Sequence, residues 1–276
     1  MPTTDALLRA AIGGAANAFT LTLDPAFQGL PETAHGGTLL AVFDALADLR
    51  GPREIVGHYR RRVPLGVPLS LDAAGDDHGV RCRVRDATAT VLVEGDVHRA
   101  GEVEPIGAPA AGDTPLPVSR TCFACGIDNA VGLRARLGFD DRSVAGLWAP
   151  DARFIGADGR LASVALTTLL DEAAFWLGAL ATGESGMTTE LRVTLHDPLD
   201  SGRVHVSGER ATVQPRPDDP RYWDTRVSAW NERGRLLAQA AITFVTVRGA
   251  ARRLVNGLLE INPRENLRRI FPAYIA

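Results

Sequence analysis

The chain has 276 residues, a formal net charge of −3 and an apolar fraction of 45%. It is long enough for two ordinary domains or one large one, and its composition is that of a globular protein. The slight negative charge argues against nucleic acid as a partner, because that partner requires a concentrated basic surface. No window approaches about 18 consecutive apolar residues, so we expect no membrane partner.

The first 20 residues contain no basic start followed by an apolar block. We therefore expect no secretory signal and a cytoplasmic protein. The three cysteines agree with a reducing compartment.

In the first half of the chain, one apolar helical segment lies among segments of strand character. A strand-like stretch at 19–23 precedes a loop with glycine and proline at 27–37, and a helix is expected over 38–49. β-branched and apolar segments after this helix favour strands. They span 55–61, 69–73, 80–85 and 87–98.

The second half repeats this order. A strand pair within 133–148 precedes a loop at 150–160 and a longer helix over 161–181. The expected later elements are strands at 188–195, 203–214, 222–231 and 236–247 and a short helix at 263–270. Strands that follow one helix in short hairpin steps favour an antiparallel sheet with the helix packed on one face. The second helix is apolar almost all round, so we expect it to be buried.

These patterns predict an α+β fold with two similar domains. The first domain covers 1–100, and the second covers 119–248. Residues 101–118 are rich in proline, glycine and alanine without apolar periodicity, which is typical of a linker. Residues 249–276 form a tail with the short helix.

Three segments resemble the hotdog-fold thioesterases, particularly the branch with phenylacetate-pathway and 4-hydroxybenzoyl-CoA thioesterases. They are FQGLPETAHGGTLLAVFDAL at 27–46, CFACGIDNAVGL at 122–133 and LTTLLDEAAFW at 166–176. The resemblance extends over roughly residues 15–247. It implies a double hotdog, with two antiparallel sheets each wrapped around a central helix. It also implies an active site between two hotdog units, in which one unit supplies helix-start amides and the other a helix acid.

When the halves are aligned on their helices, each lacks what the other retains. The first half has His-Gly-Gly at 35–37, where the second has Ala-Ser-Val at 162–164. The second half has Asp-Glu at 171–172, where the first has Asp-Ala at 44–45. We therefore expect one working site composed of parts of both halves, and a mirror site that is lost.

From the first half, the backbone N–H of Gly36, with Gly37 as a second candidate, is the expected oxyanion donor. Amides at a helix start are unpaired and carry a partial positive charge, and glycine lets a carbonyl approach closely. Gln28, which faces Ile155 in the alignment, adds a side-chain N–H to the same oxygen. His35 either contacts the substrate or only shapes the loop through a hydrogen bond.

From the second half, Asp171 is the expected general base or nucleophile. It lies mid-helix among apolar neighbours, where a buried carboxylate is costly without a purpose. Thr189, or Thr188, is expected to hold the water or the acid. Glu172 points about 100° away around the helix and is given a secondary, substrate-binding role.

Each of these motifs also has a purely structural interpretation. His-Gly-Gly is commonly just a turn and a helix start, and the two threonines are acceptable strand residues. The acids at 171–172 are compatible with a partly solvated stretch that makes salt bridges. Asp44 is interpreted as a leftover acid or a structural hydrogen-bond acceptor.

A CxxC motif at Cys122 and Cys125 suggests zinc, which requires four ligands in a structural site. Only Cys82 remains among the cysteines, and no histidine nearby has motif spacing. In the resembled family, such a segment belongs to the entry to the first strand. We therefore expect no metal and no cofactor.

Arginines 60–62 form the one short basic run. This run is explained either as a solvated strand edge that discourages pairing or as a contact for CoA phosphates.

The predicted function is hydrolysis of an acyl-CoA or acyl-carrier thioester at a single composite site between the two halves. The alternatives are a non-catalytic acyl-CoA or acyl-ligand binding protein with a decayed site and a hotdog dehydratase or hydratase. The latter usually uses a D-x4-H arrangement, but Asp171 is followed five residues on by Trp176 and Asp44 by Leu49. A homodimer is plausible because hotdog pairs often associate further.

Overall fold

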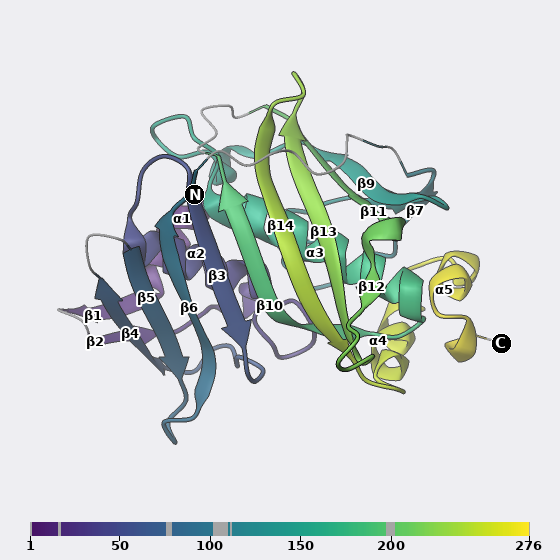
Figure 1. Cartoon of the computed structure of the whole chain (residues 1–276), viewed down its shortest axis with the longest axis horizontal. Coiled ribbons are helices and arrows are strands. Elements are labelled where there is room, and N and C mark those ends of the chain that lie inside the picture. The colour runs from purple at the N-terminus through teal and green to yellow at the C-terminus, as the bar shows by residue number, and fades with distance from the viewer. Residues whose placement is uncertain are drawn as a thin grey trace.

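The structure, a computed structural model, describes residues 2–15, 18–75, 79–101, 110, 112–196 and 202–275. Figure 1 shows a broad sheet across the molecule with two helices behind it, one for each half of the chain. Most of the predicted linker, residues 102–109 and 111, lies outside the described residues.

In the described part of the first half, two α-helices accompany six strands. In chain order these elements are α1 Thr4–Ala10, β1 Ile12–Ala15, β2 Ala18–Leu21, the 3-10 helix η1 Pro25–Phe27, α2 Gly36–Ala47, β3 Arg53–Tyr59, β4 Leu69–Gly75, β5 Gly79–Arg85 and β6 Val91–Arg99. Helix α2 begins at Gly36, two residues before the predicted start, because His35 is its extended N-cap residue. It ends at Asp48, which adopts a left-handed conformation with φ 46°.

The second half and the tail contain the remaining described elements. They are β7 Thr114–Pro115, β8 Gly138–Phe139, β9 Ser143–Trp148, η2 Ala152–Phe154, α3 Ser163–Thr182, β10 Gly186–Leu195, β11 Val204–Glu209, η3 Arg210–Thr212, β12 Gln214–Pro215, β13 Tyr222–Asn231, β14 Leu236–Thr246, α4 Ala251–Leu258, α5 Arg264–Ile270 and η4 Pro272–Tyr274. The predicted strand at 203–214 is divided into β11, the 3-10 helix η3 and β12. Two further details differ from the prediction. Strand β7 lies within the predicted linker and pairs with β8. Helix α4 was not predicted, although its buried residues Ala251, Val255 and Leu258 have helical spacing.

The prediction of two separate sheets is wrong, because the described strands form one continuous sheet. Its order is β1-β2-β4-β5-β6-β3-β10-β14-β13-β11-β9-β8-β7, and β12 pairs with β13. The halves join where β3 and β10 pair antiparallel, from Arg53 opposite Leu195 to His58 opposite Glu190. Separate sheets would each leave an edge of unpaired N–H and C=O groups at this point, and the junction satisfies both.

The loop before each central helix has the same local structure in both halves. Asp24 accepts a hydrogen bond from the N–H of Ala26, and Asp151, 127 residues later (151 − 24 = 127), accepts one from Arg153. A short antiparallel bridge then closes each loop, at Gln28 with Ala34 and at Ile155 with Leu161. The repeat inferred from the sequence is therefore also a repeat of structure.

Helices α2 and α3 cross closely behind the sheet (Figure 1). A side chain on Gly37 would place its Cβ 2.5 Å from the Thr167 carbonyl group, so the crossing requires glycine at this position. The Thr167 hydroxyl donates to the Gly37 carbonyl at 2.7 Å. This crossing sets the start of α2 against the middle of α3.

Helix α3 is long and apolar enough to cross a membrane, and it is the only helix of that kind among the described residues. In this fold, 83% of its apolar window is buried. It is therefore the core helix of the second half, as its all-round apolar sequence predicts.

Candidate active site

A cavity of about 390 Å³ opens beside the crossing of the two central helices. Parts of both halves and of the tail line it: the loop before α2, the end of β3, the segment 119–125, α3, the start of β10 and α4. Its lining is largely apolar, with a few polar groups that come together near the start of α2. Apolar walls with a few convergent polar groups are typical of small-molecule sites.

Asp171 projects from α3 to the first turn of α2 and is only 6% exposed. Its Oδ2 accepts the backbone N–H of Gly37 at 3.1 Å, and its Oδ1 accepts the Thr188 hydroxyl at 2.8 Å. The structure thus brings together an acid from the second half and the helix start from the first, as the complementary pattern predicts. These neutral donors and the positive end of α2 stabilise the carboxylate at this buried position.

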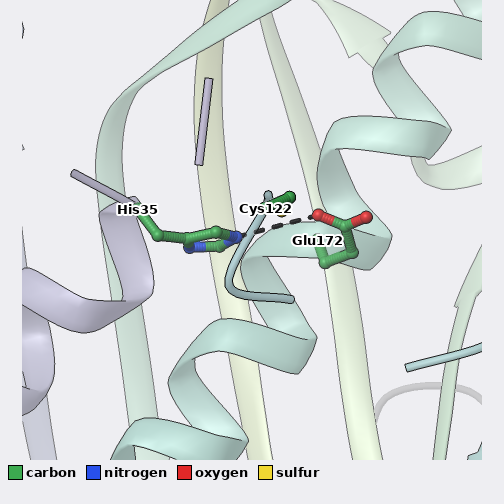
Figure 2. Close-up of side chains that lie close together, drawn as sticks. All are labelled: His35, Cys122 and Glu172. Carbon is green, nitrogen blue, oxygen red and sulfur yellow. Dashed lines mark ion pairs between the residues drawn. The ribbon is translucent and has the colours of Figure 1, made fainter. Parts of the chain in front are cut away.

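The imidazole of His35 lies between two acids. Its Nδ1 is 3.2 Å from Oδ2 of Asp171, and its Nε2 is 3.7 Å from Oε2 of Glu172 (Figure 2). Burial lowers the pKa of His35, but hydrogen bonds to the two acids outweigh burial and raise this pKa well above the usual value. The N–H of Gly37 is shared between Oδ2 of Asp171 at 3.1 Å and Nδ1 of His35 at 3.3 Å.

Gly36 lines the cavity at the first helical position of α2. Among the described residues, no acceptor is recorded for its backbone N–H, as expected at a helix start. Its carbonyl accepts the Tyr59 hydroxyl at 2.7 Å. Burial, followed by the nearby charge of Asp171, raises the pKa of Tyr59 well above its usual value, so this hydroxyl stays protonated. Tyr59 therefore fixes the Gly36–Gly37 peptide, whose N–H is the one directed to Asp171.

The second predicted donor, Gly37, has a different role. Its N–H is directed to Asp171 and its lack of a side chain permits the helix crossing. Of the two backbone N–H groups predicted as oxyanion donors, only that of Gly36 therefore remains a candidate.

Gln28 lines the cavity, as predicted, but its side chain is engaged. The amide nitrogen donates to the Thr121 hydroxyl at 2.6 Å, and the amide oxygen accepts the N–H of Glu32 at 3.0 Å. One amide hydrogen remains available to a ligand. Gln28 thus ties the loop before α2 to the segment that contains the CxxC motif.

The structure separates the two candidate threonines. Thr188 lines the cavity and donates to Asp171, whereas the Thr189 hydroxyl donates to the Thr243 carbonyl at 3.2 Å on the neighbouring strand β14. The role assigned first to Thr189 is corrected to Thr188. The reason is an irregularity in the pairing of β10 with β14 between Thr188 and Glu190, which changes the alternation of side chains.

Glu172, for which a secondary, substrate-binding role was expected, lies on the wall of the same cavity. It is 7% exposed, and its Oε1 accepts the indole N–H of Trp176 at 2.9 Å. The angle of about 100° between adjacent helix residues separates it from Asp171, but the ring of His35 reaches both acids. Glu172 therefore belongs to the polar cluster.

Several residues that line the cavity were not predicted as site residues from the sequence. Tyr59, Cys122, Cys125 and Trp176 all line it. A hydrogen bond from Cys125 lowers the pKa of Cys122, while this contact and burial raise the pKa of Cys125. The CxxC spacing was a visible signal, but its proximity to His35 and Glu172 depends on the packing of the two halves.

Comparisons with known proteins give matches in structure alone. No protein-family profile matches the chain, and no curated protein sequence matches it. A proposed thioesterase II from Thermobifida fusca superposes with a TM-score of 0.63 at 19% identity, over 88% of this chain and 99% of that one. A hotdog-fold protein from Alicyclobacillus acidocaldarius gives 0.60 at 12% identity, over 86% and 96%. The CurJ dehydratase gives 0.58 at 9% identity, over 86% and 94%.

These matches show that the chain has the hotdog fold, of the α+β class. They confirm the hotdog fold that the resemblance implied. Since thioesterases and dehydratases both appear among the structural neighbours, the fold by itself does not select the reaction. The side chains and backbone groups in the cavity have to indicate which reaction the protein catalyses.

Proposed function

We propose that the chain is a double hotdog that hydrolyses an acyl thioester at one composite site between its two units. The observation that carries this proposal is the position of Asp171. This acid of the second unit lies directly under the helix start of the first, where Gly36 offers its N–H beside it in a largely apolar cavity. The resemblance of the sequence to hotdog thioesterases supports the same reaction.

In the proposed reaction, the thioester carbonyl binds with its oxygen toward the N–H of Gly36. This N–H and the positive end of α2 stabilise the negative charge that develops on the oxygen, and one such donor contributes about 3 kcal/mol. Asp171 either removes a proton from the attacking water or attacks the carbonyl carbon itself. The Thr188 hydroxyl orients the carboxylate in both routes. A single turnover in heavy-oxygen water tests direct attack, because heavy oxygen enters Asp171 only if an anhydride between Asp171 and the acyl group forms and water opens it at the Asp171 carbon.

The lining of the cavity supports an acyl-CoA as the substrate. Apolar side chains along the wall, among them Leu39, Phe175 and Leu258, offer contacts for an acyl group. Exposed arginines at its opening provide positive charge for phosphate groups. They are Arg61, Arg62, Arg120 and Arg253. That Arg61 and Arg62 of the basic run line the cavity supports the alternative in which this run contacts CoA phosphates.

The test is a thiol-release assay of the purified protein with acyl-CoA esters of different acyl groups. We expect release from at least one ester, and release about 10³-fold slower with the Asp171→Asn variant. Tight binding of acyl-CoA without release from any ester would favour the alternative, a binding protein with a decayed site. Circular dichroism of the variant verifies that its fold is intact.

A dehydratase is the second candidate, because the structure supplies an Asp–His pair that the local sequence spacing lacks. Nδ1 of His35 lies 3.2 Å from Asp171, although the two come from different halves. Structural similarity to the CurJ dehydratase agrees with this candidate. It predicts conversion of a 3-hydroxyacyl thioester to an enoyl thioester with no release of thiol, which ultraviolet absorbance of the enoyl product detects.

A further inference from the structure

The CxxC motif borders the cavity and takes no part in the proposed hydrolysis. Cys122 and Cys125 are 5% and 6% exposed and form no disulfide. Their segment is fixed by a hydrogen bond from the N–H of Gly126 to the Cys122 carbonyl at 2.8 Å. The motif is thus a pair of ordered, buried thiols on the wall of a ligand cavity.

One of these thiols meets two further metal-ligating side chains. A ring nitrogen of His35, the sulfur of Cys122 and a carboxylate oxygen of Glu172 all lie within 4.8 Å of one another, and all three residues are buried. Figure 2 shows the three side chains converging from the start of α2, the segment before β8 and α3. Nε2 of His35 and Oε2 of Glu172 are 3.7 Å apart.

Two of these side chains, His35 and Glu172, are also oriented by a neighbour. Asp171 lies 3.2 Å from Nδ1 of His35, which leaves Nε2 directed toward the cluster. The Trp176 indole holds Oε1 of Glu172 at 2.9 Å, which leaves Oε2 free to ligate. In metal sites, the second ring nitrogen of a ligating histidine commonly contacts a carboxylate. A ligating carboxylate is commonly held by a further hydrogen bond.

The charge of the cluster favours a cation. Asp171, Glu172 and the Cys122 thiol surround one imidazole in a largely buried position. A zinc ion that replaces the Nε2 proton of His35 and the thiol proton of Cys122 leaves the net charge of the cluster unchanged, and it places a doubly positive centre beside the buried acids.

We propose that the protein binds a zinc ion through Nε2 of His35, Sγ of Cys122 and a carboxylate oxygen of Glu172. A mixed nitrogen, sulfur and oxygen set suits Zn²⁺ better than the harder Mg²⁺ or Ca²⁺. Tetrahedral ligand atoms at about 2.0–2.3 Å from zinc lie about 3.3–3.8 Å apart, so the cluster needs a contraction of about 1 Å. Three protein ligands leave the fourth position to a molecule in the cavity.

This inference goes beyond the proposed hydrolysis and does not depend on it. Metal binding is measured on the protein without substrate, and hydrolysis is measured on protein stripped with EDTA. Hydrolysis that persists after stripping leaves both proposals standing if zinc still binds. Loss of zinc binding therefore does not imply loss of hydrolysis, and loss of hydrolysis does not imply loss of zinc binding.

The experiment is titration of the full, reduced and metal-stripped chain with ZnCl₂ by calorimetry, and with Co²⁺ by absorption spectroscopy. We expect one zinc ion per chain with micromolar or tighter affinity. Cobalt should give the thiolate charge-transfer band and the intense visible bands of tetrahedral coordination. Cys122→Ser and Glu172→Gln should each weaken zinc binding at least about 10-fold, and Cys122→Ser should remove the charge-transfer band.

One variant serves as a control, and a second tests the hydrogen bond that orients Glu172. Cys82→Ser removes the third buried thiol, on β5, and should bind zinc as the wild type does. Trp176→Phe keeps all three ligands but removes the hydrogen bond to Glu172, and should weaken binding about 10-fold. Circular dichroism verifies that every variant is folded.

Three results would overturn the proposal. One is the absence of stoichiometric zinc binding by the folded, reduced wild type. Another is equal loss of affinity in Cys82→Ser and Cys122→Ser. The third is strong loss in Cys125→Ser with normal binding by Glu172→Gln, because the ion would then lie on the CxxC pair instead.

Discussion

The two central helices carry an acid at equivalent positions, and the surroundings of the two acids are opposite. Asp44 on α2 accepts two hydrogen bonds from Arg53, with Nη2 2.8 Å from Oδ2, and the two side chains are 8% and 13% exposed. Asp171 on α3 accepts the N–H of Gly37 and the hydroxyl of Thr188, lies 3.2 Å from Nδ1 of His35, and lines the cavity. The strand after each helix supplies a different partner for the acid. An arginine engages both carboxylate oxygens of Asp44, whereas a threonine engages one oxygen of Asp171, beside the cavity.

The helix starts differ in the same sense. His35 precedes α2, and the glycine after it lines the cavity. The corresponding residue before α3 is Ala162, whose side chain makes no capping hydrogen bond, and Ser163 takes the place of Gly36. The half whose acid is paired with arginine therefore has the helix start that lines the cavity, and the half whose acid lines the cavity has a helix start that does not. This arrangement supports the interpretation of one site rather than two.

Replacing each of the two acids by asparagine should give the largest difference in kcat/KM between corresponding variants of the two halves. Asp171→Asn should lower kcat/KM for acyl-CoA hydrolysis about 10³-fold, because the carboxylate that activates or performs the attack is lost. Asp44→Asn should keep the kcat/KM of the wild type. Steady-state thiol release measures both values, and similar losses in the two variants would refute a single composite site.

The same two variants should rank in the opposite order when the loss of free energy of unfolding is measured. Asp44→Asn leaves the largely buried Arg53 guanidinium without its anionic partner and should lower the free energy of unfolding by about 3 kcal/mol. Asp171→Asn should cost much less, since it relieves a buried negative charge. Urea denaturation followed by circular dichroism checks this. The double variant Asp44→Asn with Arg53→Met should regain part of the loss.

At the helix starts, Gly36→Ala should reduce kcat about 10²-fold. The added Cβ would lie 2.7 Å from Oδ2 of Asp171, which displaces the carboxylate from beneath the donor. The matched variant in the other half, Ser163→Ala, should have no effect on kcat. If Gly36→Ala changes only KM, its N–H does not serve the transition state.

The smallest effect is expected on β10. Thr188→Val removes the hydroxyl that donates to Asp171 and should lower kcat about tenfold, in accordance with the loss of one hydrogen bond to a charged group. Thr189→Val removes only a contact to the Thr243 carbonyl and should leave kcat unchanged. A larger loss in Thr189→Val would restore the original assignment of this residue.

The sequence alone was sufficient for the parts of the fold and site that depend on local pattern. Apolar periodicity indicated the two central helices, and their alignment identified Asp171 and Gly36 as the retained groups of opposite halves. Those patterns are visible because a helix start and a buried helix face impose requirements within a few neighbouring residues.

The tertiary structure decided which groups meet. It joined the sheet through β3 and β10, assigned Asp44 to Arg53, and turned Thr188 rather than Thr189 toward Asp171. It also placed the CxxC motif beside a histidine from the other half. Strand-edge pairing, a change in register and the crossing of two helices are set by contacts between distant segments, and no local pattern in the chain encodes them.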